Sequence, residues 1–72
     1  MQRRQTGHMK GERYLANTNP SKREVHDLDN AKAQCQIDEI IQAGHDKPYN
    51  FLEQAKRDGY DNCAYCIGNS RA

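Results

Sequence analysis

The chain has 72 residues, with 11 basic and 10 acidic side chains and a formal net charge of +1. One Val, four Ile, three Leu and one Phe are too few to hold a domain of this length by burial alone, so we expect an additional cross-link. With no run of 18 apolar residues and no apolar stretch after the first arginines, neither a membrane span nor a secretory signal is expected. We expect a cytoplasmic monomer. Because the net charge is close to zero, a surface that binds nucleic acid would have to be a local group of basic residues.

The amino-terminal residues 1–11 show no hydrophobic periodicity, and we expect a flexible arm there. The Gly-His-Met triplet at 7–9 also matches what a cloning site leaves in front of an expressed protein. His8 is therefore not counted among the candidate metal ligands. Residues 69–72 are expected to form a flexible tail, which leaves residues 12–68 as the folded domain.

Two strands are predicted at the start of this domain. Residues 12–17 and 22–26 are short mixed segments on either side of a Thr-Asn-Pro-Ser turn, a pattern typical of two strands joined by a turn. Residues 27–30 then form a polar loop. Further along, residues 47–49 predict an extended connector, because Pro48 lacks a backbone donor and disfavours helical geometry in the residue before it.

Two short helices complete the predicted fold. Three isoleucines recur at i, i+3 and i+4 from Ile37, which indicates an amphipathic helix that ends at Gly44. A second helix is expected from Asn50, which can cap the first turn, through residue 58, with Gly59 as its left-handed terminus. These elements predict a small zinc-stabilised α+β domain in which a short antiparallel β-meander packs with two short helices.

The three cysteines carry the clearest chemical signal. Cys63 and Cys66 form a CxxC pair, whose spacing lets two thiolates reach one metal ion from a single turn. An odd number of cysteines argues against a closed set of disulfides and leaves metal binding, redox chemistry or burial. A thioredoxin-like pair sits between a strand and a helix, whereas no helix of any length follows this one. Metal binding is therefore favoured, with Cys35 as the third thiolate.

A fourth ligand must come from upstream of the CxxC pair. His26 lies at the end of a predicted strand, whereas His45 follows a helix terminus, where an imidazolium interacts favourably with the helix dipole. Aspartates such as Asp27 are alternatives, but thiolates select zinc, and the fourth ligand in such sites is usually His or Cys. The predicted zinc ligands are His26, Cys35, Cys63 and Cys66.

Residues 51–66 resemble the second half of the metal-binding domain of Ada-type DNA methylphosphotriester repair proteins and of small Ada-like zinc modules. The shared features are an aromatic residue, a helix containing Glu and Ala, a Gly-aromatic pair, two further residues and the CxxC. Residues 14–26 are also similar to the opening of those modules, a strand and an Asn/Ser-rich turn followed by His or Cys. The resemblance covers about residues 12–67 and implies a zinc module in which Cys35 is the second ligand.

The sequence departs from this family at positions that matter for its chemistry. His26 stands where the repair proteins carry the alkyl-accepting cysteine, and the interval from His26 to Cys35 is longer than theirs. Asp61 and Asn62 stand where the family has Arg-Pro before the CxxC, which removes a basic residue that could face phosphate. The resemblance therefore implies the zinc scaffold without the residues that identify the repair reaction.

The function expected from the sequence is a structural zinc-binding module that mediates macromolecular interaction and has no catalysis of its own. One alternative is a DNA- or RNA-binding module related to DNA repair, which would use local basic residues and exposed tyrosines. A second alternative is an alkyl-acceptor or thiol-redox protein. The basic residues of the first alternative are Arg3, Arg4, Lys10, Arg13, Lys22 and Arg23.

Overall fold

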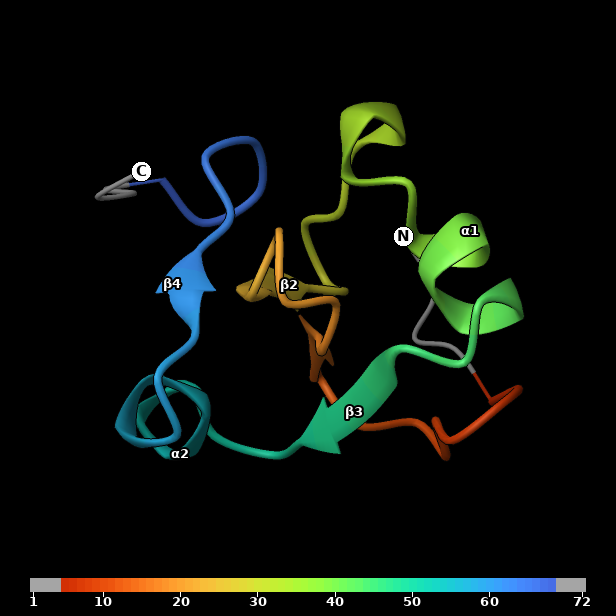
Figure 1. The fold of residues 1–72 in the computed structure, drawn as a ribbon, viewed down its shortest axis with the longest axis horizontal. Helices are drawn as coiled ribbons and strands as arrows, with labels where there is room; N and C mark the ends of the chain where they lie inside the picture. Colours follow the sequence, from red (N-terminus) through yellow and green to blue (C-terminus); the bar gives the residue numbers. More distant parts are fainter. Residues whose placement is uncertain (1–4, 69–72) are drawn as a thin grey trace.

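The computed structural model describes residues 5–68, and this part of the chain contains four short strands and two short α-helices (Figure 1). The elements in chain order are β1 (Tyr14–Asn17), β2 (Glu24–Asp27), a 3₁₀ turn (Ala33–Cys35), α1 (Ile37–Gln42), β3 (Asp46–Tyr49), α2 (Leu52–Arg57) and β4 (Asp61–Asn62). The predicted α+β class is confirmed. None of the described helices is long and apolar enough to cross a membrane.

The strands pair in one sheet with the order β3-β1-β2-β4. β1 and β2 form the predicted antiparallel hairpin, and β3 adds to the other side of β1, also antiparallel. β4 pairs with β2 in parallel. The sheet is therefore larger than the predicted meander, because the chain crosses over through α1, β3 and α2 before its last strand joins β2.

Residues 47–49 were predicted to be an extended connector, and they belong to β3. The extended conformation is confirmed, but the segment pairs in the sheet instead of only connecting two elements. Pro48 lies opposite Leu15 of β1. An edge strand tolerates this proline, because a residue there needs backbone hydrogen bonds to one neighbour only. The proline also blunts the exposed edge against pairing with another chain.

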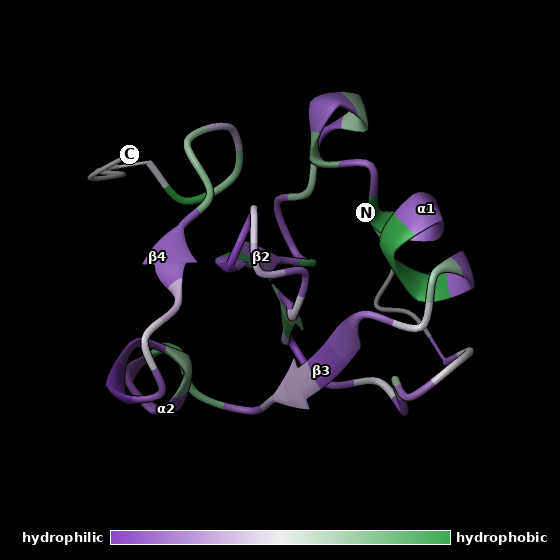
Figure 2. Cartoon of the chain, viewed as in Figure 1, coloured by the Kyte–Doolittle hydropathy of each residue, from purple (hydrophilic) through white to green (hydrophobic). Residues whose placement is uncertain are grey.

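Side chains alternate between the two faces of the sheet, and each face has its own hydrophobic cluster. Leu15 belongs to the cluster that contains α1 and all three cysteines, whereas Ala16 belongs to the cluster that contains Ala55 of α2. Figure 2 shows the apolar side of α1 in green and its polar side in purple. His26 pairs with Leu15 across the hairpin, and cross-strand partners share a face, so β2 presents His26 to the cysteine side.

Both helices end as predicted, but α2 begins differently. Gly44 after α1 and Gly59 after α2 have φ angles of 77° and 96°, the left-handed region that glycine adopts at low cost. The residue at the N-cap position of α2 is Phe51, in extended conformation and without a side-chain cap, so the prediction that Asn50 caps this helix was wrong. Leu52, the first residue of α2, packs against the hydrophobic cluster that contains Ala16 and Ala55. These apolar contacts hold the start of the helix in the absence of a capping side chain.

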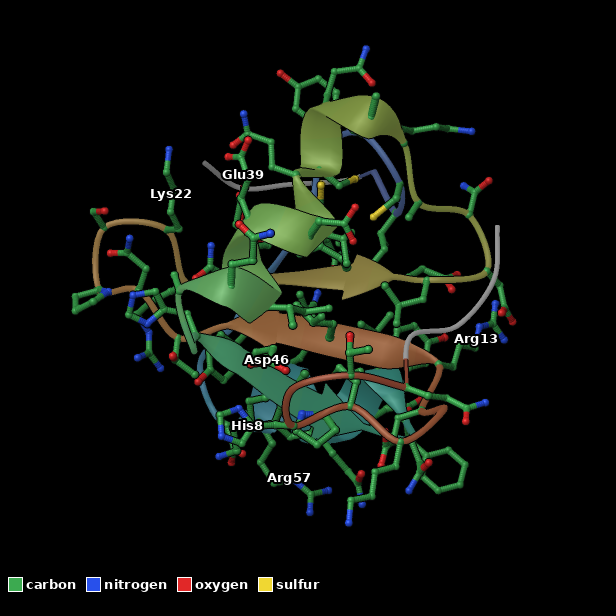
Figure 3. The ribbon with its side chains drawn as sticks, turned by 90° about the vertical axis from the view of Figure 1, so that its right-hand side faces the viewer. His8, Arg13, Lys22, Glu39, Asp46 and Arg57 are labelled. Carbon is green, nitrogen blue, oxygen red and sulfur yellow. The ribbon has the colours of Figure 1, made fainter. Side chains whose placement is uncertain are left out.

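The amino-terminal segment differs from the predicted arm in the part that the structure describes. Met9 is 1% exposed and packs in the same cluster as Leu15 and the cysteines. His8 lies beside Asp46 of β3 (Figure 3), with its backbone N–H donating to Oδ2 at 2.7 Å and its Nδ1 lying 2.8 Å from Oδ1. Residues 8 and 9 are therefore attached to the domain. The rest of the predicted arm at 1–4 and the predicted tail at 69–72 lie outside the described residues.

Candidate metal centre

Three separate segments bring one histidine and three cysteines to a single buried point. His26 comes from β2, Cys35 from the end of the 3₁₀ turn, and Cys63 and Cys66 from the turn that follows β4. Their four ligand atoms all lie within 4.8 Å of one another. Every one of the four residues is buried, with exposures between 2% and 5%. Sulfur atoms, yellow in Figure 3, gather between the 3₁₀ turn and the sheet.

The spacing of the donor atoms fits a tetrahedral metal ion. Two thiolates at about 2.3 Å from a tetrahedral zinc ion lie about 3.8 Å apart. Cys35 Sγ is 3.6 Å from Cys63 Sγ, and Cys66 Sγ is 3.9 Å from Nδ1 of His26. A disulfide requires about 2.0 Å, so the two sulfurs are not bonded. The four residues can hold a metal ion at the centre of the cluster.

Backbone N–H groups support two of the sulfurs. The N–H of Asp27 lies 3.3 Å from Cys66 Sγ, and the N–H of Lys32 lies 3.5 Å from Cys35 Sγ. Such donors stabilise the negative charge of a metal-bound thiolate and hold its orientation. The N–H of Gly68, after the CxxC pair, donates to the carbonyl of Cys63 at 2.9 Å. The two donors to sulfur therefore come from the last residue of β2 and from the loop that follows it.

That loop is itself tied down by charged and polar contacts. Nε and Nη2 of Arg13 each lie 3.1 Å from an oxygen of the Asp27 carboxylate, a bidentate arrangement that fixes the end of β2. Nδ2 of Asn30 donates to the carbonyl of Cys66 at 2.8 Å. The first contact fixes the end of β2, which carries His26, and the second joins the loop after β2 to the CxxC turn. The sequence offers no signal for them, since the partners lie far apart along the chain.

Burial decides the protonation of the cluster when no cation is bound. Burial lowers the pKa of His26 to about 4, so the imidazole is neutral at pH 7, the form that binds metals. Burial raises the pKa of Cys35 and Cys66, although the N–H groups of Lys32 and Asp27 act in the opposite direction. A divalent cation reverses this preference, so metal binding is coupled to the release of thiol protons.

The other candidate ligands lie elsewhere. His45 is not part of the cluster, and its Nδ1 lies 3.4 Å from Oγ1 of Thr18 in the hairpin. Asp27 binds Arg13 and does not belong to the cluster. Between the two histidines left open by the sequence, the fold therefore brings His26 to the cysteines.

A cavity of about 290 Å³ opens beside the cluster, and His26, Cys35 and Cys63 form part of its lining. Its walls include Lys22 and Glu24 from the hairpin, a cation and an anion on the same opening. Cys66 is not among the residues that line it. Three of the four candidate ligands therefore border this cavity.

Comparison with protein-family models, with curated proteins and with solved structures gave no match. The resemblance to Ada-like modules is therefore one of sequence pattern alone. What the structure adds is the cluster of one histidine and three cysteines, an arrangement consistent with a zinc module.

Proposed function

We propose that this protein is a small zinc-dependent binding module, in which one zinc ion held by His26, Cys35, Cys63 and Cys66 stabilises the fold. The observation that carries the proposal is the convergence of four buried donor atoms within 4.8 Å. Thiolate and imidazole ligands in a tetrahedral set select zinc over magnesium or calcium, which prefer oxygen. The resemblance to Ada-like modules supports the same metal and the same scaffold.

The zinc in this proposal has a structural role. Four protein ligands leave no open coordination position, and an open position is what a catalytic zinc uses to activate water or substrate. Structural zinc contributes about 10–16 kcal/mol to the folding of small domains, which supplies the cross-link that the thin hydrophobic core requires. We therefore propose that the module is not an enzyme. A reducing compartment keeps free thiols from forming disulfides before the metal binds, so we propose a cytoplasmic location.

We further propose that the partner is a macromolecule contacted through exposed aromatic side chains. Phe51 and Tyr65 are 62% and 59% exposed, and they are the large hydrophobic residues on the described surface. Aromatic residues are enriched in protein interfaces, where they contribute much of the binding energy. Tyr65 lies within the CxxC turn, so zinc would hold one of the two contact residues in position.

A nucleic-acid partner has weaker support, because two of its candidate arginines already have partners within the fold. Arg13 pairs with Asp27. Arg23 lies 4.7 Å from the centre of the Tyr60 ring and donates to the carbonyl of Asp58 at 3.0 Å. Titration with DNA and RNA at rising salt separates the two partner classes. Phosphate contacts require an affinity that falls steeply with salt, whereas we expect no such binding.

The proposed zinc role is tested by native mass spectrometry and circular dichroism on the full chain. We expect one zinc ion per chain, and loss of ordered structure when a chelator removes it. His26→Ala should abolish stoichiometric binding, and His45→Ala is the matched control that should retain it. A full chain that purifies without metal and keeps its spectrum in chelator would refute the proposal.

A further inference from the structure

The three thiols of the cluster have different surroundings. Cys35 and Cys63 line the 290 Å³ cavity, whereas Cys66 does not. The sulfur of Cys66 instead lies 3.3 Å from the N–H of Asp27 and 3.9 Å from Nδ1 of His26. A small reagent in the cavity therefore lies next to Cys35 and Cys63.

The two cavity-lining cysteines also have their sulfurs close together. Sγ of Cys35 lies 3.6 Å from Sγ of Cys63, although the residues are 28 positions apart in the chain. A disulfide of about 2.0 Å would require these atoms to approach by about 1.6 Å. Cys35 ends a single 3₁₀ turn, and Cys63 begins a turn, so the approach involves short segments rather than the centre of the sheet.

We propose that Cys35 and Cys63 form a site of oxidative modification, at which a hydroperoxide entering from the cavity converts the pair to a disulfide and releases the metal. This inference rests on the proposed zinc site. It differs from the CxxC pattern, which pairs Cys63 with Cys66.

The chemistry balances with hydrogen peroxide as the oxidant. The thiolate of one cysteine attacks a peroxide oxygen, which breaks the O–O bond and yields a sulfenic acid and hydroxide. The second thiolate attacks that sulfur, forms the S–S bond and releases a second hydroxide. Two thiolates lose two electrons in total, and the peroxide gains them. Because half of the ligand set is consumed, one zinc ion should leave for each disulfide formed.

Cys66 is the less suitable partner because contacts from Asp27 and Asn30 hold its sulfur and its carbonyl in place. Its sulfur accepts the N–H of Asp27, and Nδ2 of Asn30 holds its carbonyl at 2.8 Å. Pairing Cys63 with Cys66 would withdraw the Cys66 sulfur from the N–H of Asp27. Pairing Cys35 with Cys63 leaves both contacts in place.

The test treats the zinc-loaded full chain with hydrogen peroxide, follows released zinc with a chromogenic chelator, and maps the disulfide by mass spectrometry. Trypsin cuts after Lys56, so a Cys35–Cys63 disulfide links two peptides, whereas a Cys63–Cys66 disulfide stays within one. Cleavage by chymotrypsin after Tyr65 separates Cys63 from Cys66 and identifies which of them is linked. We expect Cys35 linked to Cys63, with zinc released in equal amount.

Two variants that keep four ligands serve as a matched pair. Cys66→His retains the proposed cysteine pair, and peroxide treatment of its zinc-loaded form should still link Cys35 to Cys63. Cys35→His removes the pair and should release zinc about tenfold more slowly than Cys66→His, since only one of its two remaining sulfurs, that of Cys63, borders the cavity. If one variant fails to bind zinc, the disulfide map of the wild type still decides the question.

The failures of the two proposals are distinguishable. A chain that binds no metal refutes the proposed function. A chain that binds one zinc ion but forms a disulfide to Cys66, or keeps its zinc under peroxide, refutes the oxidation site and leaves the zinc role intact.

Discussion

The attachment of the amino-terminal segment can be tested by replacing Met9 with alanine. The Met9 side chain is 1% exposed and packs with Leu15 and Leu28 in the cluster that also contains the cysteines. Replacing a fully buried methionine by alanine costs about 2–5 kcal/mol, because it removes apolar contacts and leaves a cavity. A loss of about 3 kcal/mol lowers the melting temperature of a domain of this size by about 12–24 °C.

The assay is urea unfolding at a fixed excess of zinc, so that metal binding contributes equally to both proteins. The exposed Lys10, next in the chain, gives the control Lys10→Ala, which should change the free energy of unfolding by no more than about 0.5 kcal/mol. Zinc stoichiometry should be the same in both variants, since neither residue is a ligand. A Met9→Ala protein as stable as the wild type would mean that residues 8 and 9 belong to a free arm, and the packing argument would fail.

Three further predictions concern the surroundings of the core. Gly7→Ala should lower the free energy of unfolding by about 1–3 kcal/mol in the same urea assay. The reason is that φ of Gly7 is 60° and an added Cβ would lie 2.7 Å from Oδ2 of Asp46. An unchanged free energy of unfolding would contradict this close contact. Zinc affinity, measured by chelator competition between pH 6.5 and 7.5, should fall as the pH falls, by about tenfold per pH unit for each proton displaced. The cause is that burial raises the pKa of the Cys35 and Cys66 thiols, so both hold protons at pH 7; an affinity independent of pH would refute this. Asn30→Ala removes the 2.8 Å hydrogen bond to the Cys66 carbonyl. It should lower the free energy of unfolding by about 1 kcal/mol and speed the transfer of zinc to a chelator. An unchanged transfer rate would show that this hydrogen bond does not hold the CxxC turn.

Local patterns account for what was correctly predicted about the fold. The hairpin follows from the turn chemistry between two short segments, and α1 follows from the spacing of its isoleucines. Gly44 and Gly59 end the helices because the left-handed conformation is a property of single residues. The prediction failed at Asn50, because the sequence favours a capping side chain while the structure places Phe51 at that position with Leu52 packed against the core.

Tertiary contacts account for what was missed. β4 has two residues and carries no strand pattern of its own; it exists because it pairs in parallel with β2. Two contacts of the amino-terminal segment were also missed. Met9 packs in the cluster that contains the cysteines, and His8 pairs with Asp46, 38 residues further along the chain. No sequence periodicity links such distant residues. The free energy that stabilises these contacts comes from burial, which exists only after the sheet has formed.

The candidate metal centre divides in the same way. The sequence by itself determined which residue types are available as metal ligands, predicted that a zinc ion cross-links the chain, and identified the CxxC turn as the source of two donors, because these follow from residue type and local spacing. Only the tertiary structure decided between His26 and His45, since that choice depends on the face of β2 that meets the cysteines. It also decided which sulfurs line the cavity, because a surface exists only once separate segments have packed together.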